Sequence, residues 1–335
     1  MTAARTKVGV IGAGALGYHH VRLLRELEDV ELLGFHEARS DRAAQVGQEL
    51  GVRSWDDADA LIDACEALTI VVPTPAHHAV AMSAVRRGRH VLIEKPLTAT
   101  LAEADEILEC AKRTGALVQT GHVERFNRAI RAALPYVDRP RFLESERLAP
   151  FNPRGSDVAV VLDLMIHDID LLLTLVKSGA QDVAAVGIPV LTPFVDIANA
   201  RITFTSGAVA NVTASRVSRE RMRKLRIFQQ SGYISLDLAA GNGEFYRIRD
   251  DVDLVELTKS PQQIEAFVER IPLEAPEGEP LRLEFRSFID AVRGLAPVTV
   301  TGADGREALA VALRIVQEIE RSHPTLSAGM ESLRA

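Results

Sequence analysis

Residues 7–17 have the sequence KVGVIGAGALG, and this stretch decides the fold of the first part of the chain. A short apolar run is followed by glycines in the pattern Gly-x-Gly-x-x-Gly and then by a segment with helical periodicity. Such glycines permit a tight turn, close approach of the backbone to a pyrophosphate, and close packing of helix on strand. The stretch predicts a dinucleotide-binding turn rather than a purely structural one, with the phosphates beside Gly12, Gly14, Ala15, Leu16 and Gly17.

Short apolar runs alternate with helix-like segments up to about residue 120. This alternation is typical of a parallel sheet with crossover helices. We therefore expect residues 1–121 to form an α/β domain of the Rossmann type that binds NAD(P). The expected strands are 7–11, 31–35, 68–72, 90–93 and 117–120, with a weaker one at 53–55, and the expected helices are 16–27, 41–50, 77–87 and 101–113.

The pattern changes after residue 121. A long helix is expected at 157–176, alternating runs occur at 200–204, 209–214, 225–229 and 233–238, and an amphipathic helix is expected at 304–320. Residues 187–193 and 272–280 have the composition of loops. We expect residues 122–335 to form a second, α+β domain.

Composition narrows the class of protein. The chain has 335 residues, of which 47% are hydrophobic and 25% charged, so two globular domains are expected. A net charge of -7 argues against nucleic-acid binding. Without an apolar leader or a bilayer-length apolar run, we expect a cytoplasmic protein with no membrane contact. Cys65 and Cys110 lack disulfide or zinc spacing, so we expect buried thiols and no metal.

An acidic residue follows the second expected strand. Glu37 lies about 20 residues beyond Gly17, where a carboxylate binds the ribose hydroxyls of NAD and repels the 2′-phosphate of NADP. We expect NAD as cofactor, although Arg39 and Arg42 lie close enough in sequence to leave NADP as the less favoured choice. The alternative is an ordinary surface glutamate.

The fourth expected strand ends at Glu94-Lys95-Pro96. Ligands of open parallel sheets bind beyond the carboxyl ends of the strands, so Lys95 is expected near the nicotinamide. A lysine there can donate a hydrogen bond to a reacting hydroxyl and stabilise the developing alkoxide. The alternative is a solvated lysine in a loop.

Polar residues recur at steps of four, three and four on the expected helix 157–176, at Asp163, His167, Asp170 and Thr174. This spacing places them on one helical face, bordering a cleft. A carboxylate one turn from His167 can orient its ring, which suits the histidine to accept a hydroxyl proton. A solvated stripe or a satisfied core histidine is the structural alternative.

Cationic residues suggest where a substrate lies. Residues 121–127, which contain Arg125 and Asn127, follow the last expected strand of the first domain, and Arg154 precedes the polar helix. A basic cluster, in an otherwise acidic chain, is a plausible diphosphate site or else a solvated strand face or subunit contact. It consists of Arg216, Arg219, Arg221, Arg223, Lys224 and Arg226.

These motifs resemble the Gfo/Idh/MocA oxidoreductase family over nearly the whole chain. The resemblance rests on residues 12–17, 73–77 and 88–96 and on the Asp163 and His167 pair. It implies a Rossmann domain followed by an α+β domain on an open, largely antiparallel sheet. It implies cofactor contacts at Pro73, Thr74, His77, Glu94 and Lys95, and catalytic roles for Lys95, Asp163 and His167. Val72 and Glu37 depart from the family's commoner threonine and aspartate.

Residues 121–127, 150–154 and 167–170 resemble the branch of this family that oxidises the C3 hydroxyl of UDP-N-acetylglucosamine in lipid A precursor synthesis. The resemblance implies substrate contacts at Lys95, Arg125, Asn127, Arg154, Asp163, His167 and Asp170, and a homodimer or homotetramer. The alternative enzyme is an inositol or free-sugar dehydrogenase. The non-enzymatic alternative is a cofactor-binding regulator, which the presence of Lys95, Asp163 and His167 disfavours.

Overall fold

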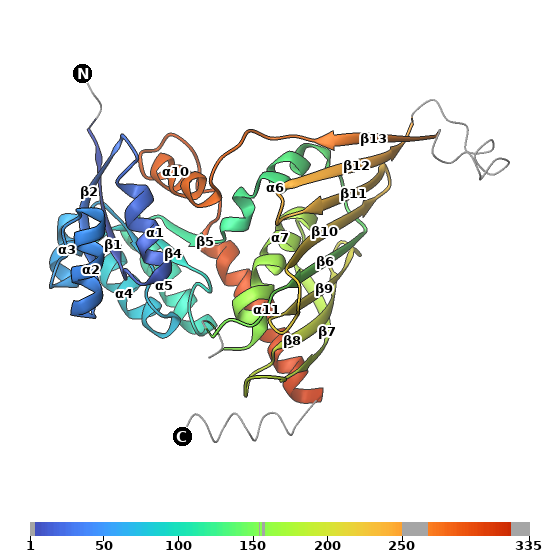
Figure 1. Cartoon of the computed structure of the whole chain (residues 1–335), viewed down its shortest axis with the longest axis horizontal. Helices are drawn as coiled ribbons and strands as arrows, with labels where there is room; N and C mark the ends of the chain where they lie inside the picture. The colour runs from blue at the N-terminus through green and yellow to red at the C-terminus, as the bar shows by residue number, and fades with distance from the viewer. Residues whose placement is uncertain (1–3, 154, 156–157, 250–266, 323–335) are drawn as a thin grey trace. The chain divides into compact units, whose positions relative to one another are not determined.

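The structure is a computed structural model that describes residues 4–153, 155, 158–249 and 267–322, in the element order of Figure 1. It divides into two compact units. Unit 1 consists of the described residues up to Val123 together with Gly278–Leu309, and unit 2 of the described residues in Glu124–Glu277 and from Ala310 onward. The expected division had one break near residue 121. The structure differs, because residues 278–309 belong to unit 1.

The described residues of unit 1 contain the parallel sheet that the sequence predicted, and its five strands have the order β2-β1-β3-β4-β5. The run at 53–55 forms only an isolated bridge between Phe35 and Ser54. One helix, α3, was not expected. The strands are β1 (Thr6–Ile11), β2 (Val30–His36), β3 (Ala67–Ile70), β4 (His90–Glu94) and β5 (Val118–Gly121), and the helices are α1 (Ala15–Leu24), α2 (Ser40–Leu50), α3 (Ala58–Ala64), α4 (Thr74–Arg86) and α5 (Leu101–Thr114).

Helix α10 (Pro280–Val292) explains why unit 1 includes residues from late in the chain. Phe285, Phe288 and Ile289 are fully buried in a core that also contains Val8 and Val10 of β1. Burying aromatic side chains of this size supplies a large part of a core's stability. Unit 1 is therefore completed by a segment that the sequence analysis assigned to the second domain.

Unit 2 contains a sheet of eight strands in the order β13-β12-β11-β10-β6-β9-β8-β7. Neighbouring strands are antiparallel except β6 and β9, which confirms the expected, largely antiparallel sheet. The strands are β6 (Phe142–Leu148), β7 (Ala180–Ile188), β8 (Ile197–Phe204), β9 (Val209–Ser215), β10 (Met222–Gln229), β11 (Gly232–Asp237), β12 (Asn242–Ile248) and β13 (Val268–Leu273).

The expected helix at 157–176 is not a single regular α-helix. A π-helical turn, η3 (Val161–Met165), precedes α7 (Ile166–Val176), and residue 157 lies outside the described residues. A π turn contains an extra residue relative to an α turn, so the regular spacing assumed from the sequence does not hold through Asp163. The remaining helical elements among the described residues are η1 (Val123–Phe126), α6 (Arg128–Ala133), η2 (Leu134–Tyr136) and α11 (Gly302–Ser322).

The sequence also led to expectations about the two cysteines, membrane spans and metal sites. Cys65 and Cys110 are buried free thiols, as expected, and burial raises the pKa of Cys65 to about 12. Over the described part of the chain, no helix is both long and apolar enough to span a membrane. No group of three or more His, Cys, Asp or Glu side chains suited to a metal occurs among the same residues.

The attachment of α10 within unit 1 is testable through Asp29, whose carboxylate accepts hydrogen bonds from Arg286 at 2.6 and 2.8 Å and from Arg293. The Arg286 hydrogen bond lowers the pKa of Asp29. Because the folded-state pKa lies below the unfolded one, the stabilisation is present above about pH 4 and is lost as the pH falls further. We expect Asp29→Asn to lower the free energy of unfolding at neutral pH by about 1 kcal/mol.

Urea denaturation of wild type and Asp29→Asn over a pH series measures this difference, which should shrink below about pH 4. The exposed Asp56 has no hydrogen bond or ion pair within the described chain, so Asp56→Asn is the matched control. A difference that stays constant down to acid pH would contradict the assignment.

Candidate active site

The glycine turn of unit 1 combines two glycines that the fold requires with one that it does not. Gly12 has a φ of +94°, and a Cβ there would lie 2.6 Å from the Val71 carbonyl oxygen. A Cβ on Gly17 would lie 2.0 Å from the Gly12 carbonyl oxygen. Gly14, at the N-cap of α1, has an ordinary φ of -60° and open space where its Cβ would be. That open space fits a ligand at the helix N-terminus, where backbone N–H groups attract phosphate.

Glu37 follows β2 and reaches this turn. Its carboxylate accepts a hydrogen bond from the Ala13 amide at 2.9 Å and from the Arg39 Nε at 3.1 Å. Burial alone would raise the pKa of Glu37, but the hydrogen bonds from Arg39 and Ala13 lower it below its usual range. Glu37 is therefore ionised at neutral pH and presents a negative charge beside the turn.

Arg42 contacts the same turn through backbone carbonyl groups. Its guanidinium donates to the carbonyl oxygens of Ala13 and Gly14 at 3.1 and 3.2 Å. The two arginines that could have bound a 2′-phosphate thus contact Glu37 and the turn itself.

A cavity of about 670 Å³ lies at the carboxyl ends of strands β1, β2 and β3. Its apolar walls suit an adenine ring, and Glu37 supplies an acceptor for ribose hydroxyls. Its lining includes five residues that were predicted from the sequence: Gly12, Gly14, Glu37, Arg39 and Pro73. The sequence analysis missed the apolar wall, which comes from several segments: Ile11, Ala58, Val71, Val72 and Val80. Lys95, Thr74, His77 and Glu94 are not among the described residues that line this cavity.

Lys95 is half-buried directly after β4, and Glu94 fixes its position. The Glu94 carboxylate accepts the Lys95 backbone N–H at 3.3 Å and lies 3.2 Å from His20 Nε2. Burial raises the pKa of Glu94, but the hydrogen bond and charge of His20, together with the charge and backbone N–H of Lys95, outweigh burial and lower it. Gly121 at the end of β5 leaves room for this carboxylate, since a Cβ there would lie 2.9 Å from it.

His77 braces the same region from α4. Its Nε2 lies 2.9 Å from the carbonyl oxygen of Val72, and its Nδ1 lies 2.9 Å from that of Pro96. The ring therefore joins the segments that follow β3 and β4, and Lys95 precedes one of these contacts by a single residue. This arrangement positions the lysine segment, while a direct cofactor contact by His77 stays a prediction.

In unit 2 the residues of the expected polar face differ in how deeply they are buried. Asp163 in η3 and His167 in α7 are half-buried, whereas Asp170 is fully buried. Asp170 accepts two hydrogen bonds from Arg125, at 2.8 and 2.6 Å. The structure thus pairs two of the expected substrate ligands with each other, and their contact with substrate stays a prediction.

Asn127 also takes part in local structure. Its Oδ1 caps α6 by accepting the Ala129 N–H, and its Nδ2 donates to Glu124 and to the Leu238 carbonyl. Its role as a substrate ligand stays a prediction as well. Arg154, the other expected phosphate ligand, lies outside the described residues.

A buried arginine that the sequence analysis missed organises this part of unit 2. Arg147 donates to Asp168 at 2.6 and 3.2 Å and to Glu124 at 2.9 Å. Burial opposes its charge, but Asp168 and Glu124 outweigh burial and raise the pKa of Arg147. The burial of Arg147 could have been predicted from the sequence, because Arg147 follows Leu143 and Ser145 in the inward-facing register of β6.

Together the glycine turn, the parallel sheet and the cavity beside them identify unit 1 as a domain of the dinucleotide-binding type. Residues 6–122 match the family model described as an oxidoreductase family with an NAD-binding Rossmann fold, and residues 130–235 match the C-terminal domain of the same group. The chain belongs to the Gfo/Idh/MocA oxidoreductase family. The expected family and the expected class of enzyme, a nicotinamide-dependent oxidoreductase, are thereby confirmed.

The chain is similar to relatives with related activities. UDP-N-acetylglucosamine 3-dehydrogenase of Acidithiobacillus ferrooxidans is 36% identical over 330 residues, covering 94% of this chain and 97% of the relative. A solved structure of that enzyme has a TM-score of 0.86 and covers 95% of this chain and 98% of its own. The scyllo-inositol 2-dehydrogenase (NAD(+)) of Bacillus subtilis is 30% identical over 233 residues, covering 64% and 68% respectively.

The open space at Gly14 gives a direct test of the cofactor site. Gly14→Ala should leave the melting temperature of the protein nearly unchanged but weaken NAD binding about tenfold or more, because the new methyl group would occupy the space of the phosphates. Gly17→Ala should lower the melting temperature as well, because its Cβ clashes with backbone.

Calorimetric titration with NAD and thermal unfolding together separate the two effects. Wild-type NAD affinity in Gly14→Ala would show that the phosphates bind elsewhere.

Proposed function

We propose that the protein oxidises the C3 hydroxyl of UDP-N-acetylglucosamine to the 3-keto sugar, with NAD as hydride acceptor. The observation that carries this proposal is the full-length similarity to an enzyme with that name, at 36% identity. In the reaction the substrate loses a hydride from carbon and a proton from its hydroxyl, and NAD, when bound, accepts the hydride. The protein must supply the group that takes the proton and the charge that stabilises the alkoxide.

We assign these tasks to three residues. His167 acts as general base, Asp163 orients it or binds a substrate hydroxyl, and Lys95 stabilises the alkoxide or serves as the alternative base. The half-buried positions of all three support the assignment, since each side chain is shielded without being sealed in a core. The brace of Glu94, His20 and His77 supports the role of Lys95, because a reacting group needs a fixed position.

NAD is the proposed cofactor rather than NADP. The ionised carboxylate of Glu37 lies where a 2′-phosphate would have to bind. Arg39 and Arg42, the nearest cations, contact Glu37 and the glycine turn. A phosphate there would meet a negative charge with its neighbouring cations already engaged.

We also propose a place for the reaction in a pathway and an oligomeric state for the protein. The 3-keto product suits an aminotransferase that makes a 3-amino sugar, which would place the enzyme in lipid A precursor synthesis. We also propose a homodimer or homotetramer formed through the sheet of unit 2. Its support is a row of neighbouring aromatic rings, stacked or tilted, across four adjacent strands, with successive centroids 5.0–5.6 Å apart: Phe142, Phe228, Tyr233 and Tyr246.

The second candidate is an inositol or free-sugar dehydrogenase, which the similarity to the Bacillus subtilis enzyme favours. Steady-state formation of reduced cofactor separates the candidates. We expect kcat/KM for UDP-N-acetylglucosamine to exceed that for N-acetylglucosamine, glucose or inositols by about a hundredfold or more, and NAD to be preferred over NADP. Turnover of inositols with no turnover of the nucleotide sugar would reject the proposed substrate.

The catalytic roles predict a separation of binding from chemistry. Lys95→Met and His167→Ala should each retain NAD binding but lower kcat about a hundredfold or more, because each removes a charge or proton carrier needed in the transition state. Lys112→Met and His78→Ala remove the same residue types from exposed or partly exposed positions of unit 1 and serve as controls.

Rapid-mixing and steady-state kinetics measure kcat, and calorimetry measures NAD affinity. Near-normal kcat in both Lys95→Met and His167→Ala would contradict the catalytic roles assigned to Lys95 and His167.

A further inference from the structure

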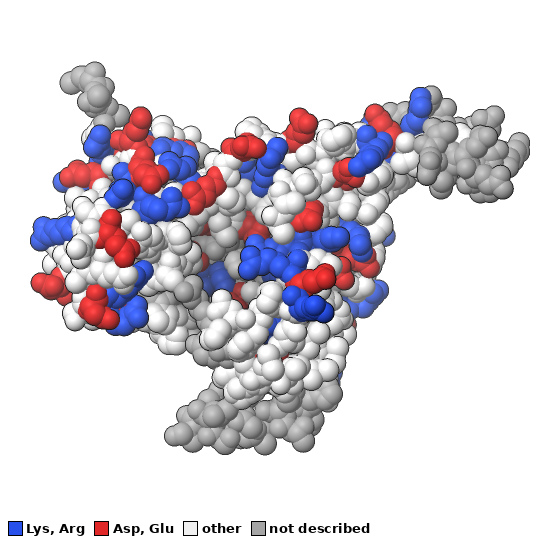
Figure 2. All heavy atoms as spheres, viewed as in Figure 1, with Lys and Arg blue, Asp and Glu red and all other residues white. Residues whose placement is uncertain are grey.

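The basic cluster at residues 216–226 does not form one surface. Figure 2 shows Lys and Arg side chains gathered on the visible face of unit 2. Along β10, Leu225 and Ile227 are buried and Lys224 and Arg226 lie on the other face, where Arg226 contacts Glu144. Arg223 shares the inward register of Leu225 and donates to the buried Glu124 at 3.3 Å. Strand alternation therefore sends the cations of this cluster to opposite faces of the sheet.

The inward members of the cluster line one cavity of about 260 Å³. In the sheet order β10-β6-β9, β6 and β9 run parallel and β10 runs against them. The C-terminal ends of β6 and β9 therefore lie beside the N-terminal end of β10. Four arginines from these three strand ends line the cavity: Arg147, Arg216, Arg221 and Arg223. Asn152 and Asp163 also line it.

Two of these arginines are neutralised within the fold. Arg147 is held by Asp168 and Glu124. Arg216 is buried, lies 3.7 Å from Asp196, and donates to the carbonyl oxygens of Gly155 and Val158. Both form the inner wall of the cavity and fix its shape.

The other two have fewer acidic partners within the fold. Arg223 lies directly opposite Arg147 in the β6–β10 register, and the two share the single carboxylate of Glu124. Like charges placed directly opposite each other on neighbouring strands repel. Burial, and then the charge of Arg147, lowers the pKa of Arg223, and Arg221 adds to this effect. Arg221 is exposed, and no carboxylate within the described chain forms an ion pair with it.

We propose that this cavity binds the diphosphate of the nucleotide-sugar substrate, with Arg221 and Arg223 as its ligands. A diphosphate relieves the repulsion among the guanidiniums, and two arginine forks match its oxygens in pairs. Asp163 lines the same cavity, so the diphosphate site and one proposed catalytic residue lie together within unit 2. This inference rests on the proposed function and extends it by naming the residues that select a nucleotide sugar over a free one.

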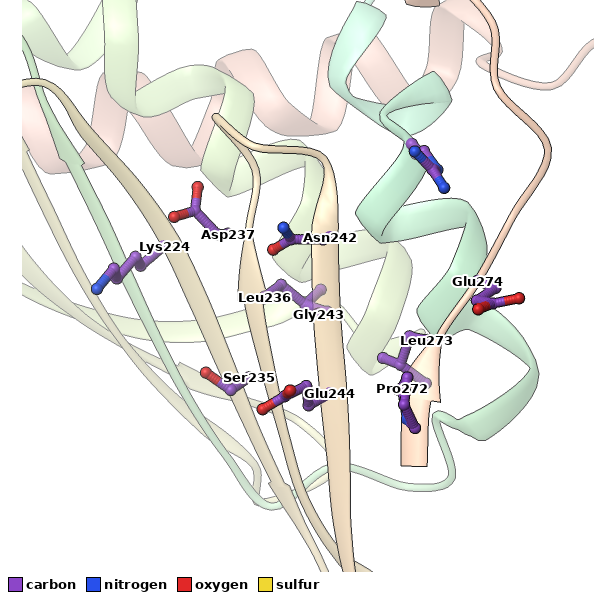
Figure 3. Close-up of a pocket in the computed structure, with 11 residues that line it drawn as sticks. Lys224, Ser235, Leu236, Asp237, Asn242, Gly243, Glu244, Pro272, Leu273 and Glu274 are labelled. Atoms are coloured by element: carbon purple, nitrogen blue, oxygen red, sulfur yellow. The ribbon is translucent and has the colours of Figure 1, made fainter. Parts of the chain in front are cut away.

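Lys224, another cation of the basic cluster, lines a different cavity in unit 2. This cavity has a volume of about 520 Å³ and is lined by Arg128 and Lys224 but also by Asp237, Glu244 and Glu274 (Figure 3). Its acidic side chains outnumber its basic ones, which makes it unsuited to a diphosphate. Lys224 therefore provides a matched control, because it neighbours Arg223 in sequence and faces the opposite side of the sheet.

The test is calorimetric titration of the full chain with UDP at saturating NAD, which prevents UDP from entering the cofactor site. Arg221→Gln and Arg223→Gln should each raise the Kd for UDP about tenfold or more, and Lys224→Gln should change it less than about twofold. Each variant is checked by thermal unfolding. Arg221 is exposed, so its variant keeps the test valid even where Arg223→Gln, which loses a contact with Glu124, unfolds.

Turnover distinguishes failure of this inference from failure of the proposed function. KM for UDP-N-acetylglucosamine should rise with the Kd for UDP in the two cavity variants. If the wild type oxidises the nucleotide sugar and binds UDP, but Arg221→Gln and Arg223→Gln behave like Lys224→Gln, the cavity is not the diphosphate site. If the wild type neither binds UDP nor oxidises the nucleotide sugar, the proposed function fails and this inference fails with it.

Discussion

The close approach of helix α1 to the end of strand β1 is the constraint on which the cofactor site depends. Gly17 allows this approach, because any side chain there would collide with the Gly12 carbonyl. The approach brings the N-terminus of α1 to the carboxyl edge of the sheet and leaves Gly14 facing open space. It also puts the Ala13 amide within reach of Glu37. One backbone contact thus sets both the open helix N-terminus, where we propose that the phosphates bind, and the position of the Glu37 carboxylate, which we propose binds the ribose.

In unit 2 a buried charge network has the corresponding role. Arg147 connects β6 to η1 through Glu124 and to α7 through Asp168. Each of these contacts opposes a large desolvation penalty, so such a network is weak evidence for stability. Its effect is geometric: it fixes three elements beside the cavity that contains Asp163, Arg221 and Arg223. Through Glu124 the network also holds Arg223 of the neighbouring strand β10 beside Arg147 at the wall of this cavity.

The sequence predicted those features that depend on local patterns. The glycine turn and the strand and helix alternation of residues 7–120 follow from neighbours within a few residues, and Glu37 was singled out by its spacing from Gly17. The return of residues 278–309 to unit 1 could not be predicted, because the amphipathic pattern of α10 does not say which core its phenylalanines enter. The partner of Asp170 was likewise hidden, since Arg125 lies far from it in sequence. Arg147 could have been found, because strand alternation placed it on the inward face.

Transfer of an isotopic label tests the central claim most directly, because it identifies the bond that the enzyme breaks. The protein is incubated with NAD and UDP-N-acetylglucosamine carrying deuterium at C3, and the reduced cofactor is analysed by mass spectrometry. The account predicts one deuterium in the nicotinamide ring and a 3-keto sugar, whereas substrate labelled at C4 gives unlabelled reduced cofactor. Reduced cofactor without deuterium from the C3-labelled substrate would contradict it.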